Sequence, residues 1–211
     1  IALTFTSSES TTNFDAGDIT VTNGAISNFA GSGDTYTATF TPTTDGASTI
    51  KVEAGDYTDA AANDNTVSNT FAWTYDGTAP TMTITSTTVS SGDTSNDGTV
   101  AYVFTSNSPT ADFVETDITE TGGTWSAFTA VTTVKYTATF TPTGQGATSV
   151  SVAAGAFTDA AGNDNTVSNT FAWTYDSVGP TMTITATGLI SGGSSNAATV
   201  ALTFTSNEAT T

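Results

Sequence analysis

Nearly all side chains of this protein that can do chemistry are oxygen donors. Among its 211 residues, 20 are aspartate or glutamate and only 2 are lysine, while histidine and cysteine are absent. Without an imidazole or a thiol, the chain cannot form a serine–histidine or cysteine–histidine nucleophile, a zinc site or a disulfide. Carboxylate, amide and carbonyl oxygens are instead the preferred ligands of hard cations such as Ca²⁺. Cation binding is therefore the chemistry that these residue types favour.

The net charge of −18 excludes two classes of partner. A nucleic-acid-binding surface needs many cationic side chains to replace the counterions of the phosphates, and Lys51 and Lys135 alone cannot do this. An anionic membrane surface repels the chain for the same reason. No apolar run approaches the roughly 18 residues of a membrane-spanning segment. We therefore expect neither nucleic-acid binding nor membrane insertion.

The sequence repeats itself almost without change. The segment 58–76 returns as 158–176, with Ala62 replaced by Gly162 as the single difference. Further segments recur in the same order, and the last residues resemble the first ones. We therefore divide the chain into a repeat that lacks its first strand (1–77), a complete repeat (78–176) and the start of a third repeat (177–211). This organisation predicts a window onto a longer tandem array.

Within one repeat, apolar residues alternate with polar ones, as in Phe171, Trp173 and Tyr175. A period of two is typical of β-strands, and no stretch has helical spacing. The pattern predicts about seven short strands, separated by turns rich in Gly, Pro, Asn and Asp. Seven strands in about 100 residues are typical of an Ig-like β-sandwich. The expected fold class is all-β, with tandem Ig-like β-sandwich domains.

The first repeat lacks a strand that the complete repeat has. Its sheet would therefore have an unpaired edge and its core an open side. We expect a segment outside this sequence, or a neighbouring chain, to fill that gap.

The strand order of an Ig-like sandwich brings several acidic and amide residues to one end of the complete repeat. The chain enters at the end where the connection between the sixth and seventh strands lies. Asp76, Asp159, Asn163 and Asp164 should converge there, and further candidates at the same end are Asn107, Asp112 and Glu115. This set suits Ca²⁺, which takes six to eight oxygen ligands. The alternative is that these residues only cap their own turns.

Three segments resemble a known family. They are 158–163 (Thr-Asp-Ala-Ala-Gly-Asn), 179–184 (Gly-Pro-Thr-Met-Thr-Ile) and 136–142 (Tyr-Thr-Ala-Thr-Phe-Thr-Pro). They are similar to the bacterial Ig-like repeats of long secreted adhesins and surface fibres. The resemblance covers essentially the whole chain. It implies an extracellular or cell-surface protein of bacterial origin.

The resemblance also implies Ca²⁺ between successive domains. Carried over to this sequence, the ligands at the start of the complete repeat are Asp76, Asp159 and Asn163. Those of the first repeat are Asp59, Asn63 and Glu9, and those of the third are Asp176 and Glu208. The sequence departs from the family pattern at Ser108, which stands where Glu9 and Glu208 stand, and at Ala62.

We expect a structural or adhesive rod rather than an enzyme, because a catalytic site seldom needs two nearly identical copies in series. The expected partners are neighbouring repeats of the same chain or identical chains in a fibre. A cell-surface or glycan ligand is a further class of partner. The alternative functions are carbohydrate binding through Trp125, which replaces Ala25 of the first repeat, and ice binding through Thr-x-Thr runs. Carboxylate pairs could in principle support glycoside hydrolysis, but the sequence indicates no substrate cleft.

Overall fold

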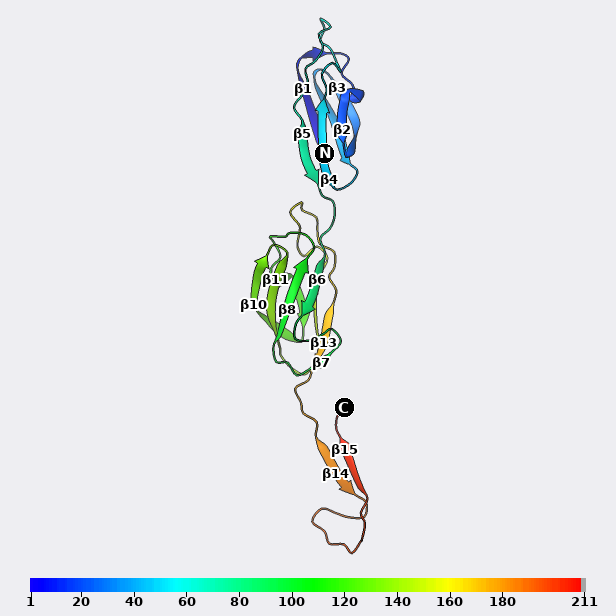
Figure 1. Ribbon diagram of the computed structural model, residues 1–211, viewed down its shortest axis with the longest axis vertical. Coiled ribbons are helices and arrows are strands. Elements are labelled where there is room, and N and C mark those ends of the chain that lie inside the picture. Colours follow the sequence, from blue (N-terminus) through cyan, green and yellow to red (C-terminus); the bar gives the residue numbers. More distant parts are fainter. Residues whose placement is uncertain (210–211) are drawn as a thin grey trace.

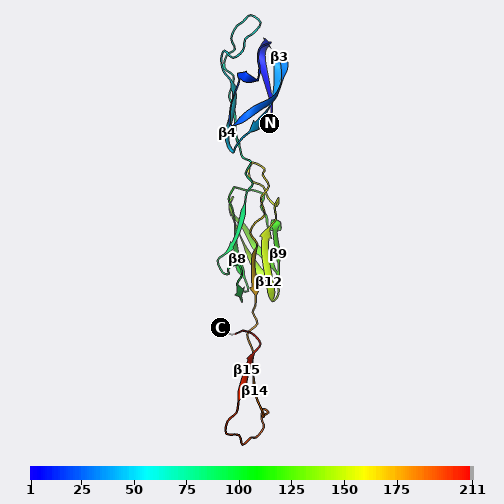
Figure 2. The same cartoon turned by 90° about the vertical axis from the view of Figure 1, so that its right-hand side faces the viewer.

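The computed structural model describes residues 1–209 as three units that follow one another along the long axis of the molecule (Figure 1; Figure 2). The regular secondary structure of these units consists of strands, apart from two short 3₁₀ helices, η1 (Ala16–Asp18) and η2 (Glu115–Asp117). The expected all-β fold class is thus confirmed. No helix in this part of the chain has the length and apolar character that crossing a membrane requires.

The middle unit is a sandwich of two four-stranded sheets. One sheet has the order β10-β11-β8-β6 and the other the order β7-β13-β12-β9. All neighbouring strands are antiparallel except β7 and β13. The strands are β6 (Met82–Ser86), β7 (Thr94–Ser95), β8 (Val100–Ser106), β9 (Ile118–Thr121), β10 (Gly123–Thr132), β11 (Lys135–Pro142), β12 (Gly146–Val152) and β13 (Phe171–Tyr175). This is the architecture that the alternating pattern predicted, with the two-residue strand β7 in addition.

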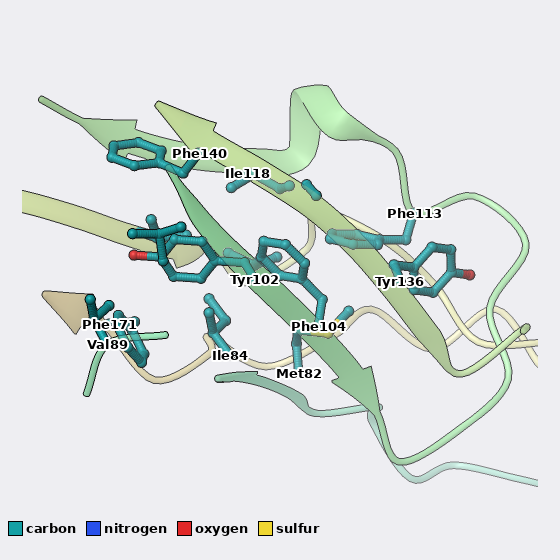
Figure 3. Close-up of a cluster of buried hydrophobic side chains, with 14 of the residues drawn as sticks. Met82, Ile84, Val89, Tyr102, Phe104, Phe113, Ile118, Tyr136, Phe140 and Phe171 are labelled. Carbon is teal, nitrogen blue, oxygen red and sulfur yellow. The ribbon is translucent and has the colours of Figure 1, made fainter. Parts of the chain in front are cut away.

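The core of the middle unit lies between its two sheets (Figure 3). Tyr102, Phe104 and Phe140 are 0 % exposed. The Tyr102 hydroxyl accepts a hydrogen bond of 3.0 Å from Nε1 of Trp173, which links the two sheets. Burial raises the pKa of Tyr102 to about 12, although the bond from Trp173 opposes this shift. Tyr102 and Phe104 are two residues apart on β8, so the buried aromatic residues alternate along the strand as a period of two requires.

The first unit has the same two layers but fewer strands. Strand β1 (Ala2–Thr11) pairs with β3 (Gly24–Pro42), and the facing sheet has the order β2 (Ile19–Thr22), β4 (Gly46–Val52), β5 (Phe71–Tyr75). No counterpart of β6 or β7 covers this sandwich within the described residues. Phe71 is consequently 52 % exposed, whereas its equivalent Phe171 is 5 % exposed.

The third unit is a hairpin of β14 (Met182–Ala186) and β15 (Leu202–Ser206). These two strands correspond to β6 and β8 of the middle unit. Met182, Ile184 and Phe204 are 55 %, 59 % and 60 % exposed, because this hairpin has no second sheet to pack against. Residues 210–211 of the third repeat lie outside the described part of the chain.

Trp125 is partly buried and packs against the core of the middle unit. Its ring lies 5.3 Å from that of Tyr102 and 5.2 Å from that of Phe140, measured between centroids. Its counterpart in the first unit is Ile26 and not Ala25, so this part of the sequence alignment was wrong. Gly24 and Gly123 occupy equivalent places, since a Cβ atom on Gly24 would lie 2.1 Å from the ring of Phe40 and one on Gly123 would lie 2.2 Å from the ring of Phe140. Two residues further along, Ile26 is therefore the equivalent of Trp125.

Candidate functional site

The candidate site is the junction between the first and the middle unit. The side-chain nitrogen of Asn163 donates one hydrogen bond to the backbone carbonyl of Asp76 and one to Oδ2 of Asp159, both 3.1 Å long. In Figure 1 the loop between β12 and β13 accordingly reaches the linker at the upper end of the middle unit. The structure thus brings together Asp76, Asp159 and Asn163.

The loop that carries Asp159 folds around this carboxylate. Oδ1 of Asp159 accepts hydrogen bonds from the backbone nitrogens of Ala161 and Asn163, both 2.9 Å long. The backbone bond from Asn163 contributes most to a lowered pKa of Asp159, and burial opposes it. Gly162 closes the turn with a φ of 87°, a conformation that glycine adopts without strain. Oδ1 of Asp159 therefore binds the backbone of its own loop, while Oδ2 faces the side chain of Asn163.

The first unit builds the same loop at its far end (Figure 1). Oδ1 of Asp59 accepts from the backbone nitrogens of Ala61 and Asn63, and Oδ2 accepts from the Asn63 side chain at 2.7 Å. The side-chain bond from Asn63 is the largest cause of the lowered pKa of Asp59. Among residues 1–209 no linker contacts this copy, and Asp59 still caps the turn of its own loop.

Among residues 1–209, no hydrogen bond joins the side chains of the remaining predicted ligands to Asn163 or Asp159. The backbone of Asp164 forms an isolated bridge with Thr158, and Asp176 accepts from the backbone of Val178. Glu208 accepts from the side chain of its neighbour Asn207, and Glu9 is exposed on β1. Within residues 1–209, no three acidic side chains come close enough together to hold a metal ion.

The three further candidates serve local contacts. Oδ2 of Asp112 accepts from the backbone nitrogen of Thr158 at 3.0 Å and from its hydroxyl at 2.7 Å. Asn13 takes the place of Asp112 in the first unit and accepts from the nitrogen of Thr58 at 3.1 Å. Oδ1 of Asn107 accepts from the backbone of Thr81, and Glu115 begins helix η2. Asp112 therefore ties two loops together at the end of the middle unit that faces the linker.

Sequence reasoning missed Asp45, which holds the linker from the side of the first unit. Oδ1 of Asp45 accepts from the backbone nitrogen of Gly77 at 2.7 Å, and its other oxygen accepts from the hydroxyl of Thr78. At the next linker Gln145 does the same, since its amide exchanges two hydrogen bonds with Ser177. Both residues precede an equivalent glycine, Gly46 and Gly146, but neither belongs to a recognisable motif.

The donors at the junction fit a hard cation in kind. The Asp76 carbonyl and Oδ2 of Asp159 both face the side-chain amide of Asn163, and that amide also carries an oxygen. Carboxylate, carbonyl and amide oxygens are the ligands that Ca²⁺ takes, and water completes such sets. Three protein donors are fewer than the six to eight that Ca²⁺ binds, so a large share of its shell would be water.

The two-sheet sandwich and its tandem repetition define the class of protein, which is a chain of Ig-like domains. The sequence profile of the family described as "Bacterial Ig-like domain" matches residues 1–75 and 76–175. The chain belongs to this family, and the resemblance inferred from its repeats is confirmed.

One solved structure similar to this chain is that of FdeC, an Escherichia coli adhesin. The two are 12 % identical with a TM-score of 0.35, and the match covers 80 % of this chain and 55 % of that one. The chain thus spans about half of that structure, and a similarity of this size does not bear on function. Among curated protein sequences, none matched this chain.

Proposed function

We propose that this chain is a segment of an extracellular rod or fibre, structural or adhesive, built from tandem Ig-like repeats. The observation that carries the proposal is the linker, which both neighbouring units hold. Asp45 of the first unit binds Gly77 and Thr78, and Asn163 of the middle unit binds the carbonyl of Asp76. A linker held at both ends limits bending between the units, which is what a spacer needs. The proposed role is non-enzymatic.

Calcium at this junction is part of the proposal. Asp159, Asn163 and the Asp76 carbonyl would hold the ion, with water completing its shell. A divalent cation reduces the repulsion within a chain of net charge −18. It also stiffens the linker, because it replaces the weak bonds of one amide with several stronger contacts.

Small-angle scattering and thermal unfolding, each with calcium and with a chelator, test this proposal. We expect calcium to lengthen the particle and to raise its melting temperature. Asn163→Ala should abolish both responses, and the matched control Asn63→Ala, in the loop that contacts no linker among residues 1–209, should keep them. Identical curves with calcium and with chelator would remove the metal from the proposal.

Neither alternative function gains support from a specific contact. Trp125, on which carbohydrate binding depended, packs against the core. Ice binding through Thr-x-Thr runs would need threonines at neighbouring positions of adjacent strands. On β6, Thr83 lies opposite Thr105 of β8, but Thr85 lies opposite Val103, so no regular array of threonines forms across these two strands. The rod therefore remains the function that we propose.

A further inference from the structure

The first and the last segment of the middle unit, residues 80–95 and 166–176, run side by side in the same direction. At the beginning of both segments, the nitrogen of Thr166 donates a hydrogen bond of 2.9 Å to the carbonyl of Pro80. Near the end of both segments, β7 and β13 pair in parallel. We refer to these two segments together as the terminal pair.

Hydrogen bonds connect the terminal pair at several points along its length. The side chain of Asn169 binds both backbone polar groups of Ile84. Further along, the hydroxyl of Ser91 donates to the carbonyl of Ala172 at 3.3 Å and accepts from the nitrogen of Ala172 at 3.2 Å. Three backbone hydrogen bonds of 2.7–2.9 Å follow, from Gly92 to Ala172, from Thr174 to Asp93 and from Asp176 to Ser95.

The terminal pair also covers the core of the middle unit. Met82, Ile84 and Val89 of its first segment are 3 %, 2 % and 6 % exposed. Phe171 and Trp173 of its last segment are 5 % and 2 % exposed. All five residues belong to the hydrophobic cluster between the two sheets. Separating the two segments therefore exposes apolar side chains to water, in addition to breaking the hydrogen bonds.

The positions of the two linkers decide how tension acts on the terminal pair. The chain enters the middle unit at one end of the sandwich and leaves it at the opposite end (Figure 1; Figure 2). Tension along the molecule therefore pulls residues 80–95 toward the first unit and residues 166–176 toward the third unit, so that the two segments must slide past each other. Because the hydrogen bonds of paired strands run between the strands, sliding loads them together, whereas peeling from one end breaks them one at a time.

We propose that the terminal pair is a mechanical clamp, which keeps the middle unit folded when the rod carries tension. The inference rests on the proposed role as a rod, because only a unit that is held at both ends transmits force. Tension enters through residues 80–95 and leaves through residues 166–176, so it reaches strands such as β10 and β11 only through these two segments. Unfolding under force is controlled by the rate of unfolding, and the clamp slows this rate for one direction of pulling.

Single-molecule stretching of the whole chain in two directions tests the clamp, and the absence of native cysteine allows handles to be attached at chosen positions. Handles on Ala79→Cys and Val178→Cys load the terminal pair in shear. Handles on Ala79→Cys and Val167→Cys pull at the beginning of both segments and peel them apart. At equal force, the unit should survive at least about tenfold longer in shear, because several hydrogen bonds must then break together. The length released, about 3.4 Å per residue, identifies the unit that opens.

Two serine substitutions test whether the bonds of the terminal pair carry the load. Ser91→Ala removes two hydrogen bonds to Ala172, and it should shorten the lifetime under shear about tenfold. The matched control is Ser126→Ala, since Ser126 is also exposed and its hydroxyl donates to the carbonyl of Thr139 between β10 and β11. This control should keep the lifetime of the wild type under shear. Chemical denaturation without load checks that both variants fold.

Two outcomes would overturn the inference. The first is an equal lifetime in the two pulling directions, and the second is an equal effect of Ser91→Ala and Ser126→Ala under shear. Either result would leave the rod intact if scattering still showed a linker that limits bending. A chain that bends freely at the linker, but whose middle unit resists tension as expected, would contradict the rod alone. The two proposals therefore fail separately.

Discussion

The side-chain amide of Asn169 pairs with both backbone polar groups of Ile84. The nitrogen of Ile84 donates to Oδ1 at 2.8 Å, and Nδ2 donates to the carbonyl of Ile84 at 3.0 Å. The amide thus takes the place of a neighbouring strand along the outer edge of β6. It joins this edge to the segment that leads into β13, and so it closes one side of the sandwich.

Replacing Asn169 should loosen this closure. We expect Asn169→Ala to lower the free energy of unfolding of the middle unit by about 1–2 kcal/mol, since two hydrogen bonds to the backbone are lost. The control is Asn69→Ala, which removes the same amide where no strand of the described residues lies beside it. It should change the stability of the monomer by less than about 0.5 kcal/mol. Chemical denaturation followed by tryptophan fluorescence measures both, and equal effects would contradict the role of Asn169.

The turn after Asp59 and Asp159 offers a reciprocal pair of substitutions. Ala62 has a φ of 66° and Gly162 a φ of 87°, both in the left-handed region. Ala62→Gly should stabilise the first unit, and Gly162→Ala should destabilise the middle unit, each by about 1 kcal/mol. A Cβ atom on Gly162 would meet no other atom within 4 Å, so the effect comes from the backbone alone. Changes of the opposite sign in calorimetry would exclude this explanation.

Asp112 should make the stability of the middle unit depend on pH. Burial acts to raise its pKa, but the hydrogen bonds from Thr110 and Thr158 outweigh burial and lower the pKa below the usual value. A carboxylate with a lowered pKa stabilises the fold above its unfolded-state pKa, and this contribution is lost as the pH falls through the folded-state pKa. Acid should therefore protonate Asp112, weaken its hydrogen bonds to Thr158 and destabilise the middle unit.

Substitution with the neutral amide of the first unit tests this dependence. Asp112→Asn should flatten the dependence of the melting temperature on pH below about pH 4, because asparagine does not titrate there. Asn13→Asp should give the first unit a corresponding dependence. An unchanged pH profile in both variants would show that this carboxylate does not control acid stability.

Asp45 should control the bending of the linker without contributing to the core. Asp45→Ala removes the contacts to Gly77 and Thr78, so scattering should show a shorter average length and a broader distribution of lengths. Gln145→Ala is the control at the second linker and should leave the first junction unchanged. Melting of either unit should move little, since Asp45 is exposed. A length distribution equal to that of the wild type would contradict the role of Asp45.

Local pattern predicted the fold because the strands alternate strictly. The side chains of Tyr102 and Phe104 are buried two residues apart, as a period of two requires. The repeats also placed Asp76, Asp159 and Asn163 at one end of the middle unit, because the order of strands in an Ig-like sandwich determines which loops share an end. Metal binding by these residues stays a prediction.

The sequence by itself determined the all-β class and the tandem repeats, since these depend on periodicity and on self-similarity. The tertiary structure alone decided which side chains hold the linker and which strand positions face each other. Asp45 reaches Gly77 across 32 positions, and Trp125 matches Ile26 through the packing of glycine beneath a phenyl ring. Contacts between residues far apart in sequence depend on the geometry of the whole sandwich, and no local pattern carries that geometry.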